Sequence, residues 1–163
     1  MRPVVRFLKY FSYNTYYVEG GGAGRTLAIG NRVGLANTLF NLSSGSIRIE
    51  DQCVFGYNVM LLTGQHRFAN GERAGLTENS WGGGDAEVPS SGFDICIGRG
   101  TWIASGVIVV GGVTIGRNVV VAGGAIVTHD LPDYSLAAGI PARVIGDTRT
   151  WSPRTSTGVS TDD

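Results

Sequence analysis

An aliphatic residue returns every six positions through the second half of this chain. The run has no slip over six units: Ile97, Ile103, Val109, Ile115, Val121 and Val127. A period of six matches neither an amphipathic helix, which repeats at 3.6 residues, nor a hairpin ladder, whose turn spacing varies. It fits a short strand and a tight turn, repeated around a three-sided prism. Three units make a coil of about 18 residues, so residues 18 apart are expected to stack in columns that fill the interior.

The first half repeats the same step less cleanly. Two frames are visible: Ile29 and Leu35 in one, and Ile49, Phe55 and Leu61 in the other. Ile29 and Ile49 are 20 residues apart instead of 18. A two-residue swelling at one corner of the prism, within Asn41–Gly45, would absorb this difference. The sequence therefore predicts an all-β coil from residue 25 to residue 147.

Composition supports many tight turns in a compact fold. The chain has 26 glycines but only 5 prolines among 163 residues, which disfavours disorder and collagen. Lys and Arg number 13, as do Asp and Glu, so no charge excess draws the chain to nucleic acid. Cys53 and Cys96 are too few for a disulfide framework and form no C-x-x-C pair. With no signal peptide and no apolar run of 18 residues, we expect a cytoplasmic protein with no bound metal.

Three segments depart from the period. Residues 67–94 are rich in Gly, Ser, Asn and Pro, and we expect them to form a long loop extruded from the coil. Residues 1–24 are expected to be a cap, with a short amphipathic helix over Arg2–Phe11. We expect this helix to serve as a cap or a subunit contact rather than to lie on a membrane surface. Residues 148–163 have no period and are expected to be a disordered tail.

Three stretches carry a resemblance to a known family: Thr101–Ser105 (TWIAS), Ala138–Gly146 (AGIPARVIG), and Ile47–His66, in which paired repeats run into a histidine. Over residues 27–147 the chain resembles the hexapeptide-repeat acyltransferases, and among them the sugar and polysaccharide O-acetyltransferase branch. The resemblance implies a left-handed parallel β-helix, acetyl-CoA as cosubstrate, and a homotrimer with each active site between neighbouring subunits. One departure concerns His129, which stands where the family often has a lysine that contacts the cofactor phosphates.

His66 is the candidate catalytic residue. Transfer of an acyl group from a thioester to a hydroxyl needs a base that takes the hydroxyl proton, and histidine suits this task near neutral pH. The chain has two histidines, and His66 lies where the repeat breaks into the long loop. That position and the resemblance together favour His66 as the general base. His129 is expected to lie at the edge of the cofactor or in solvent, and Asp94 is a candidate to orient the His66 ring.

The resemblance also implies binding residues. Small or polar side chains beside the later coils are expected to contact acetyl-CoA: Ser105, Gly123, Gly124, Thr128 and Arg143. Three residues are expected to bind the acceptor: Asn37, Asn41 and Trp81. Trp102 could lie at a subunit interface or face the cofactor. The glycines could instead serve only the corners, and Arg143 could be a solvated charge.

The function predicted from the sequence is transfer of an acetyl group from acetyl-CoA to a hydroxyl of a sugar or polysaccharide precursor. Two other enzyme functions stay open, namely N-acetylation of an amino sugar and O-acetylation of a xenobiotic alcohol. A non-catalytic β-helix scaffold is an alternative of another class. A zinc carbonic anhydrase of the same prism shape needs three histidine ligands, and the chain has two.

Overall fold

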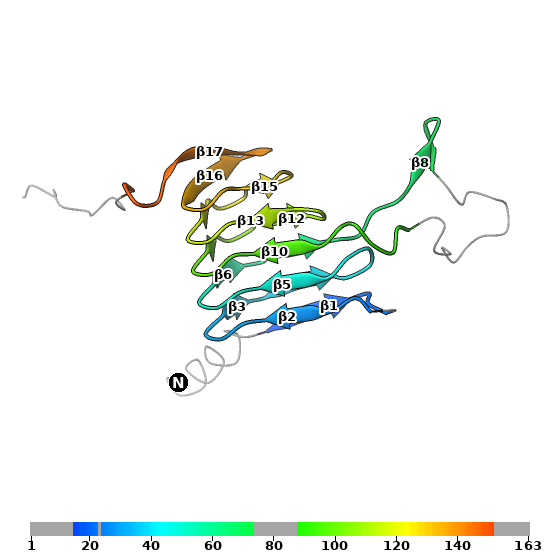
Figure 1. Cartoon of the computed structure of the whole chain (residues 1–163), viewed down its shortest axis with the longest axis horizontal. Coiled ribbons are helices and arrows are strands. Elements are labelled where there is room, and N and C mark those ends of the chain that lie inside the picture. Colours follow the sequence, from blue (N-terminus) through cyan, green and yellow to red (C-terminus); the bar gives the residue numbers. More distant parts are fainter. Residues whose placement is uncertain (1–14, 23, 74–87, 152–163) are drawn as a thin grey trace, which may run out of the picture.

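The computed structural model describes residues 15–22, 24–73 and 88–151. Within these residues the chain forms 17 β-strands and no helix, so no helix there is long and apolar enough to cross a bilayer. The strands wind around a three-sided prism of stacked coils (Figure 1). Each coil supplies one strand to each of three parallel sheets. We name these sheets face I, face II and face III, in the order in which the chain visits them.

The three faces contain all but two of the strands. Face I stacks four strands: β2 (Leu27–Ile29), β5 (Ile47–Ile49), β10 (Ile95–Ile97) and β13 (Thr114–Ile115). Face II stacks six: β3 (Gly34–Ala36), β6 (Val54–Tyr57), β11 (Trp102–Ile103), β14 (Val120–Val121), β16 (Ser135–Gly139) and β17 (Ala142–Asp147). Face III stacks five: β1 (Tyr16–Glu19), β4 (Thr38–Asn41), β7 (Met60–Leu62), β12 (Ile108–Val110) and β15 (Ile126–Val127). Every neighbouring pair is parallel except β16 and β17, whose antiparallel hairpin ends the coil.

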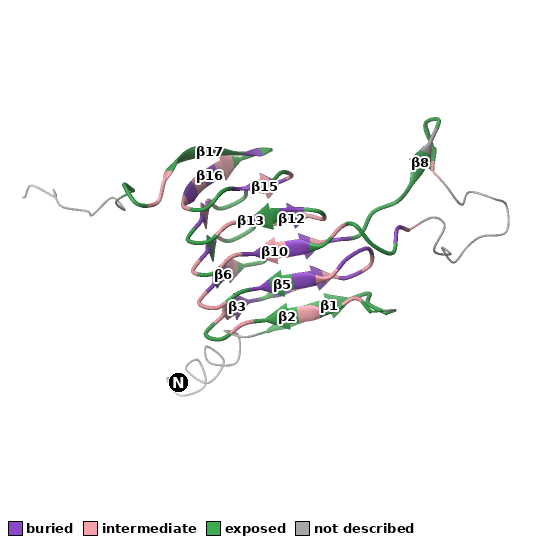
Figure 2. Ribbon diagram, in the orientation of Figure 1, coloured by how far each residue is buried: buried purple, intermediate pink, exposed green. Residues whose placement is uncertain are grey.

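The predicted columns are present at the predicted spacing of 18. Ile97 pairs with Ile115, Ile103 with Val121, and Val109 with Val127, and all six side chains are buried. Figure 2 shows buried residues, in purple, recurring along the stacked coils. The structure adds a second inward position, two residues before the first in each unit. It is filled by Ile95, Thr101, Val107, Val113, Val119 and Ala125. Two buried side chains from each six-residue unit thus fill the prism, and their burial is the main favourable term in its stability.

Thr101 is the one polar residue in the second column. Its hydroxyl donates to the carbonyl oxygen of Gly116 at 2.8 Å and accepts from the amide of Val119 at 3.2 Å. The buried hydroxyl is therefore hydrogen-bonded to the coil above, as a polar group in a core must be.

The offset between the two halves has two sources. Phe40 and Ile49 are nine residues apart instead of six, whereas Leu35 and Phe40 are five residues apart instead of six. Both spacings follow from the registers in which β2, β3 and β4 pair with β5, β6 and β7. The register of face II shifts between Gly34 and Ala36, which accounts for the missing residue. The expected swelling after Asn41 is thus present and is one residue larger than predicted. The bulge between Gly34 and Ala36 offsets the extra residue.

The long loop leaves the prism after β7 and returns before β10. Its described part includes a small hairpin of β8 (Phe68–Ala69) and β9 (Glu72–Arg73), which stands away from the prism (Figure 1). Residues 74–87 lie outside the described residues, and so does the helix expected over Arg2–Phe11.

Ordered structure continues four residues past the expected start of the tail. The hydroxyl of Thr148 donates to the carbonyl oxygen of Asn118 at 2.9 Å, and its amide donates to that of Tyr134 at 2.8 Å. The Arg149 guanidinium lies over the Tyr134 ring, 4.9 Å from its centroid, and pairs with Asp147. Trp151 lies beside Trp102, with 6.5 Å between ring centroids. We name residues 147–151 the C-terminal latch. Residues 152–163 lie outside the described residues.

The contacts within the latch predict how the Asp147 carboxyl titrates. Hydrogen bonding by the Arg149 side chain is the largest cause that lowers the pKa of the Asp147 carboxyl from its ordinary 3.8 to about 2. Because the folded pKa lies below the unfolded one, the stabilisation is complete above about pH 4 and is lost as the pH falls through about 2. Carboxyl ¹³C NMR titration is expected to give a midpoint near 2 for Asp147. Arg149→Gln is expected to return the midpoint toward its ordinary value, and an unchanged midpoint would contradict the pairing.

Candidate functional site

His66 lies at the corner between faces III and I, where the chain leaves the prism. The residues before it are held firmly. The buried hydroxyl of Thr63 donates to the carbonyl oxygen of Asn41 at 2.8 Å and accepts from the amide of Ser44 at 3.1 Å. The amide of Gln65 donates to the Ser44 hydroxyl at 3.2 Å. His66 follows directly and is exposed. An exposed imidazole on a fixed strand end can meet a substrate without a large movement of its backbone.

Asn41 lies in the coil below, at the same corner. Its strand pairs with β7, and its side-chain oxygen accepts from the amide of Ser43 at 3.1 Å. A Cβ added to Gly64 would lie 2.9 Å from that oxygen. The side chain of Asn41 therefore packs against the backbone two residues before His66. The structure brings these two predicted residues together.

Asn37 lies at the opposite edge of face III, at the corner between faces II and III. Its φ of 53° marks it as a turn residue, and its side-chain nitrogen donates to the Asn58 side-chain oxygen in the coil above. These two asparagines form a short ladder at the corner. The structure thus separates Asn37 from His66 within one chain.

Three of the predicted cofactor residues share that II/III corner. The Ser105 hydroxyl accepts from the amide of Tyr57 at 3.0 Å, and the Ser105 carbonyl oxygen accepts from the amide of Gly124 at 3.0 Å. A Cβ on Gly123 would lie 3.3 Å from the same carbonyl oxygen. Ser105, Gly123 and Gly124 are all exposed. The corner therefore presents bare backbone and a fixed hydroxyl, to which the narrow arm of a ligand could lie close.

The other two predicted cofactor residues lie at the last coil. A hollow of about 310 Å³ is lined on one side by His129 and Asp130 and on the other by Arg143 of β17. The Thr128 hydroxyl and Nδ1 of His129 are 2.8 Å apart, within hydrogen-bond distance. The Arg143 guanidinium is the group here that suits a phosphate, and it shares the hollow with His129 and the carboxylate of Asp130. The tertiary structure thus joins Thr128 to Arg143 through His129.

Asp94 lies where the loop rejoins the prism. One of its carboxylate oxygens accepts from the amide of Ser46 at 2.7 Å, which fixes the returning chain to the coil below. Its role in orienting His66 stays a prediction. Trp81 lies outside the described residues. Among the described residues, no three His, Cys, Asp or Glu side chains gather in a way that could hold a metal ion.

The outward sides of the three faces differ in a way that the sequence analysis missed. Face III carries an apolar column of Tyr17, Leu39, Met60, Ile108 and Ile126. Face II carries another, made of Val54, Trp102, Val120 and Leu136. Face I instead carries Ala28, Arg48, Cys96 and Thr114.

A pattern in the sequence could have predicted these apolar columns. Val107–Val110 and Val119–Ala122 are unbroken apolar runs, which are typical of strands covered on both sides. The prism interior covers only one side of each strand. The unbroken runs therefore fit strands whose outward side is apolar as well as the inward side, as on faces II and III.

Comparison with known proteins gives the class of the fold. No protein-family model matches the chain. It is 53% identical over 53 residues to the galactoside O-acetyltransferase of Escherichia coli K12, an alignment that covers 32% of this chain and 26% of that enzyme. Two solved structures each have a TM-score of 0.59. A maltose O-acetyltransferase from Clostridium difficile 630 is 27% identical, over 82% of this chain and 67% of that one. A galactoside acetyltransferase in complex with coenzyme A is 28% identical, over 91% of this chain and 73% of that one.

The chain therefore has the left-handed β-helix fold of the hexapeptide-repeat acetyltransferases, as its six-residue period and the resemblance together predicted. The resemblance to the sugar O-acetyltransferases is likewise confirmed, since those that it matches are named for galactosides and maltose. The matched segment spans about a quarter of the length of the Escherichia coli enzyme.

The II/III corner gives a prediction for stability. A Cβ added to Gly56 would lie 2.4 Å from the backbone nitrogen of Ser105, so that corner would have to move. Gly56→Ala is expected to lower the free energy of unfolding by about 1–3 kcal/mol, measured by urea denaturation. Gly34→Ala is the matched control on the same face, because a Cβ there meets no atom within 4 Å. Equal effects of the two substitutions would rule out close packing at the corner.

Proposed function

We propose that this protein transfers an acetyl group from acetyl-CoA to a hydroxyl of a sugar or polysaccharide precursor, with His66 as the general base. The observation that carries the proposal is the exposed histidine at the strand end of an acetyltransferase fold, beside Asn41 and the mouth of the loop. The names of the matched enzymes support a sugar acceptor. The coenzyme A complex of one of them supports the cosubstrate.

The proposed reaction needs one proton to move twice. Acetyl-CoA supplies the acetyl group as a thioester. His66 accepts the proton of the acceptor hydroxyl while the hydroxyl oxygen forms a bond to the thioester carbonyl carbon. The carbon–sulfur bond then breaks, and the proton passes from His66 to the departing thiolate. The products are an acetyl ester and free coenzyme A, and His66 is regenerated.

The remaining predicted residues would bind the two substrates. Exposed backbone at Gly123 and Gly124, with the Ser105 hydroxyl, suits the pantetheine arm, while the hollow beside Arg143 suits the phosphates. In that hollow, His129 would stand in for the lysine of related enzymes. Asn41 would contact the acceptor, and we assign Asn37 and Trp81 the same role on the resemblance alone. Two free cysteines fit a reducing compartment, and we propose the cytoplasm.

We also propose that the active protein is a cyclic homotrimer. A ring of identical subunits needs two different contact patches on each, and the outward apolar columns of faces II and III supply two. A second argument comes from the site itself. His66 and Ser105 lie at opposite edges of face III, so one copy's III/I corner would meet its neighbour's II/III corner. Each active site would then contain residues of two subunits.

The His66 assignment is tested by substitution. His66→Ala is expected to lower kcat for acetyl transfer by about 100- to 10,000-fold, because the hydroxyl loses its proton acceptor. His129→Ala is the comparison, since its loss is expected to raise the KM for acetyl-CoA and change kcat far less. Turnover is measured by release of free coenzyme A with sugar and amino-sugar acceptors. Full activity of His66→Ala on the preferred acceptor would refute the base assignment. Absence of acetyl-CoA binding would favour a scaffold.

The shared site is tested by mixing two inactive variants. Ser105→Trp fills the II/III corner, whereas His66→Ala removes the base. Random trimers of the two, made by co-expression, are expected to regain about a quarter of normal activity, because one site in four pairs two intact halves. Co-expression of each variant with itself is the control. If the mixture stays inactive although mass spectrometry detects mixed trimers, both halves of the site belong to one chain.

A further inference from the structure

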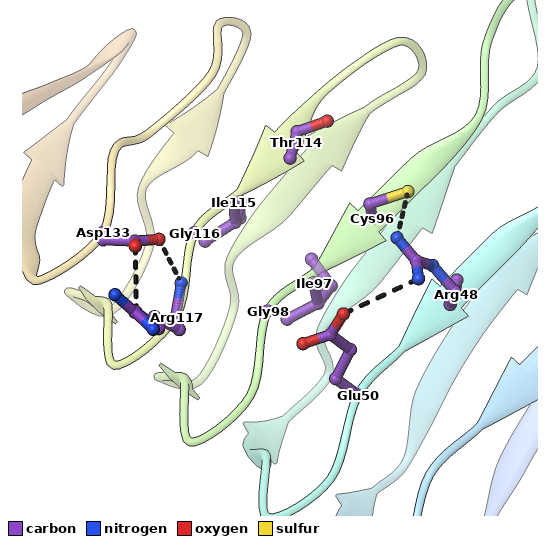
Figure 3. A pocket seen from close by; sticks show the side chains of 10 residues that line it. All are labelled: Arg48, Glu50, Cys96, Ile97, Gly98, Thr114, Ile115, Gly116, Arg117 and Asp133. Atoms are coloured by element: carbon purple, nitrogen blue, oxygen red, sulfur yellow. Dashed lines mark hydrogen bonds and ion pairs between the residues drawn. The ribbon is translucent and has the colours of Figure 1, made fainter.

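Face I carries a groove that the proposed reaction does not use. Its volume is about 410 Å³, and it crosses the strands of three successive coils. Figure 3 shows the side chains that line it, with Arg48 and Glu50 at one end and Arg117 and Asp133 at the other. Cys96 and Thr114 lie between these pairs. The hollow at the last coil adjoins this groove, since the Asp130 carboxylate beside the hollow accepts from the amide of Thr114 at 2.7 Å, but the two have no lining residue in common.

Fixed polar pairs line the groove. The distance between Arg117 Nε and Asp133 Oδ2 is 2.9 Å, and that between Arg48 Nη1 and Glu50 Oε1 is 3.6 Å. Each carboxylate also accepts a backbone amide: Glu50 from Arg99 at 3.0 Å, and Asp133 from Arg117 at 2.9 Å. The amide bonds position the carboxylates, and Asp133 pairs closely with Arg117, whereas the Arg48 guanidinium also donates to the sulfur of Cys96 at 3.9 Å.

The charges of the lining decide what kind of ligand it suits. Two arginines face one glutamate and one aspartate, so their formal charges cancel and leave no excess to attract an anion or a cation. An apolar ligand would leave these charged groups without water or a partner. A neutral ligand rich in hydroxyl groups avoids both costs, since each hydroxyl donates one hydrogen bond and accepts others. Arginine keeps several N–H donors in a fixed fork, which suits neighbouring hydroxyls.

The groove also adjoins the corner that carries His66. Cys96 follows Asp94 by two residues and Arg48 follows Ser46 by two, and the hydrogen bond between Asp94 and Ser46 lies at the III/I corner. One end of the groove thus begins next to the point where the loop leaves the prism. Face I is also the face without an outward apolar column, so it stays open if faces II and III are covered by neighbouring copies.

We propose that the groove on face I binds the sugar units of a neutral glycan chain that adjoin the unit acetylated at His66. This inference rests on the proposed function and narrows the acceptor from sugars in general to oligosaccharides and polysaccharides. The same groove would add little to the binding of a single sugar, because a monosaccharide held at His66 does not extend along face I.

The test blocks the groove and compares short with long acceptors. Thr114→Trp places a large side chain on the outward side of β13, within the groove. Ala28→Trp is the matched control, because Ala28 is also exposed and outward on face I but does not line the groove. Arg48→Gln is a milder second variant that keeps the fold if the tryptophan does not. The full-length protein is used, with neutral malto- and galacto-oligosaccharides of one to five units.

Binding is measured by saturation-transfer NMR without acetyl-CoA, and transfer by KM and kcat with it. Thr114→Trp is expected to weaken binding of the five-unit oligosaccharides at least tenfold and to raise their KM equally. Arg48→Gln is expected to weaken that binding about threefold. Affinity for the single sugar, kcat, and the KM for acetyl-CoA are expected to stay unchanged in both variants, and Ala28→Trp is expected to match the natural protein throughout.

Three outcomes would overturn the proposal: the natural protein binds no oligosaccharide of either series, Thr114→Trp binds the five-unit chains normally, or it loses long and short sugars equally. Failure of the proposed function is seen separately. If no acetyl group is transferred but Thr114→Trp still loses the long chains selectively, the groove is a glycan site on a protein with another activity.

Discussion

The stacking of coils at a constant register is the constraint on which the rest of the structure depends. Each inward aliphatic side chain has to lie on another one coil away, as Ile97 lies on Ile115 and Ile103 on Val121. A change of one residue within a coil would turn the inward side chains of the next strand outward. Variation in length is therefore concentrated at the corners and in the residues next to them. The bulge at Gly34 and the swelling after Asn41 lie at or next to corners and together restore the register.

The same constraint explains why chemistry gathers at the corners. The strands have their inward side committed to packing, and on two faces their outward side is apolar as well. On those two faces, exposed backbone and polar side chains that packing does not require are found mainly at the turns. Ser105 lies in a turn, Thr128 directly follows β15, and His66 lies in the irregular segment after β7. The long loop leaves at a corner for the same reason, and His66, the proposed base, lies directly before it.

The three faces differ in the polarity of their outward sides. Faces II and III expose apolar columns, which cost free energy in water unless a second surface covers them. Face I exposes arginine, glutamate, threonine and a thiol, which water solvates well. A prism with two apolar faces and one polar face is suited to a ring in which the polar face points outward. The site proposed to be shared between subunits and the proposed glycan groove both rest on that asymmetry.

The sequence by itself determined the fold, because a strict period of six leaves one way to bury Ile97 through Val127 together. It also singled out His66, where the period stops. It could not determine that Asn41 would lie beside His66 while Asn37 lies at the other edge, since four residues along a strand lead from one corner to the next. The hollow that joins His129 to Arg143, and the groove that joins Arg48 to Arg117, unite residues from different coils. Which residues become neighbours depends on the number of residues in each corner and loop. That number determines their relative positions only once the coils are stacked.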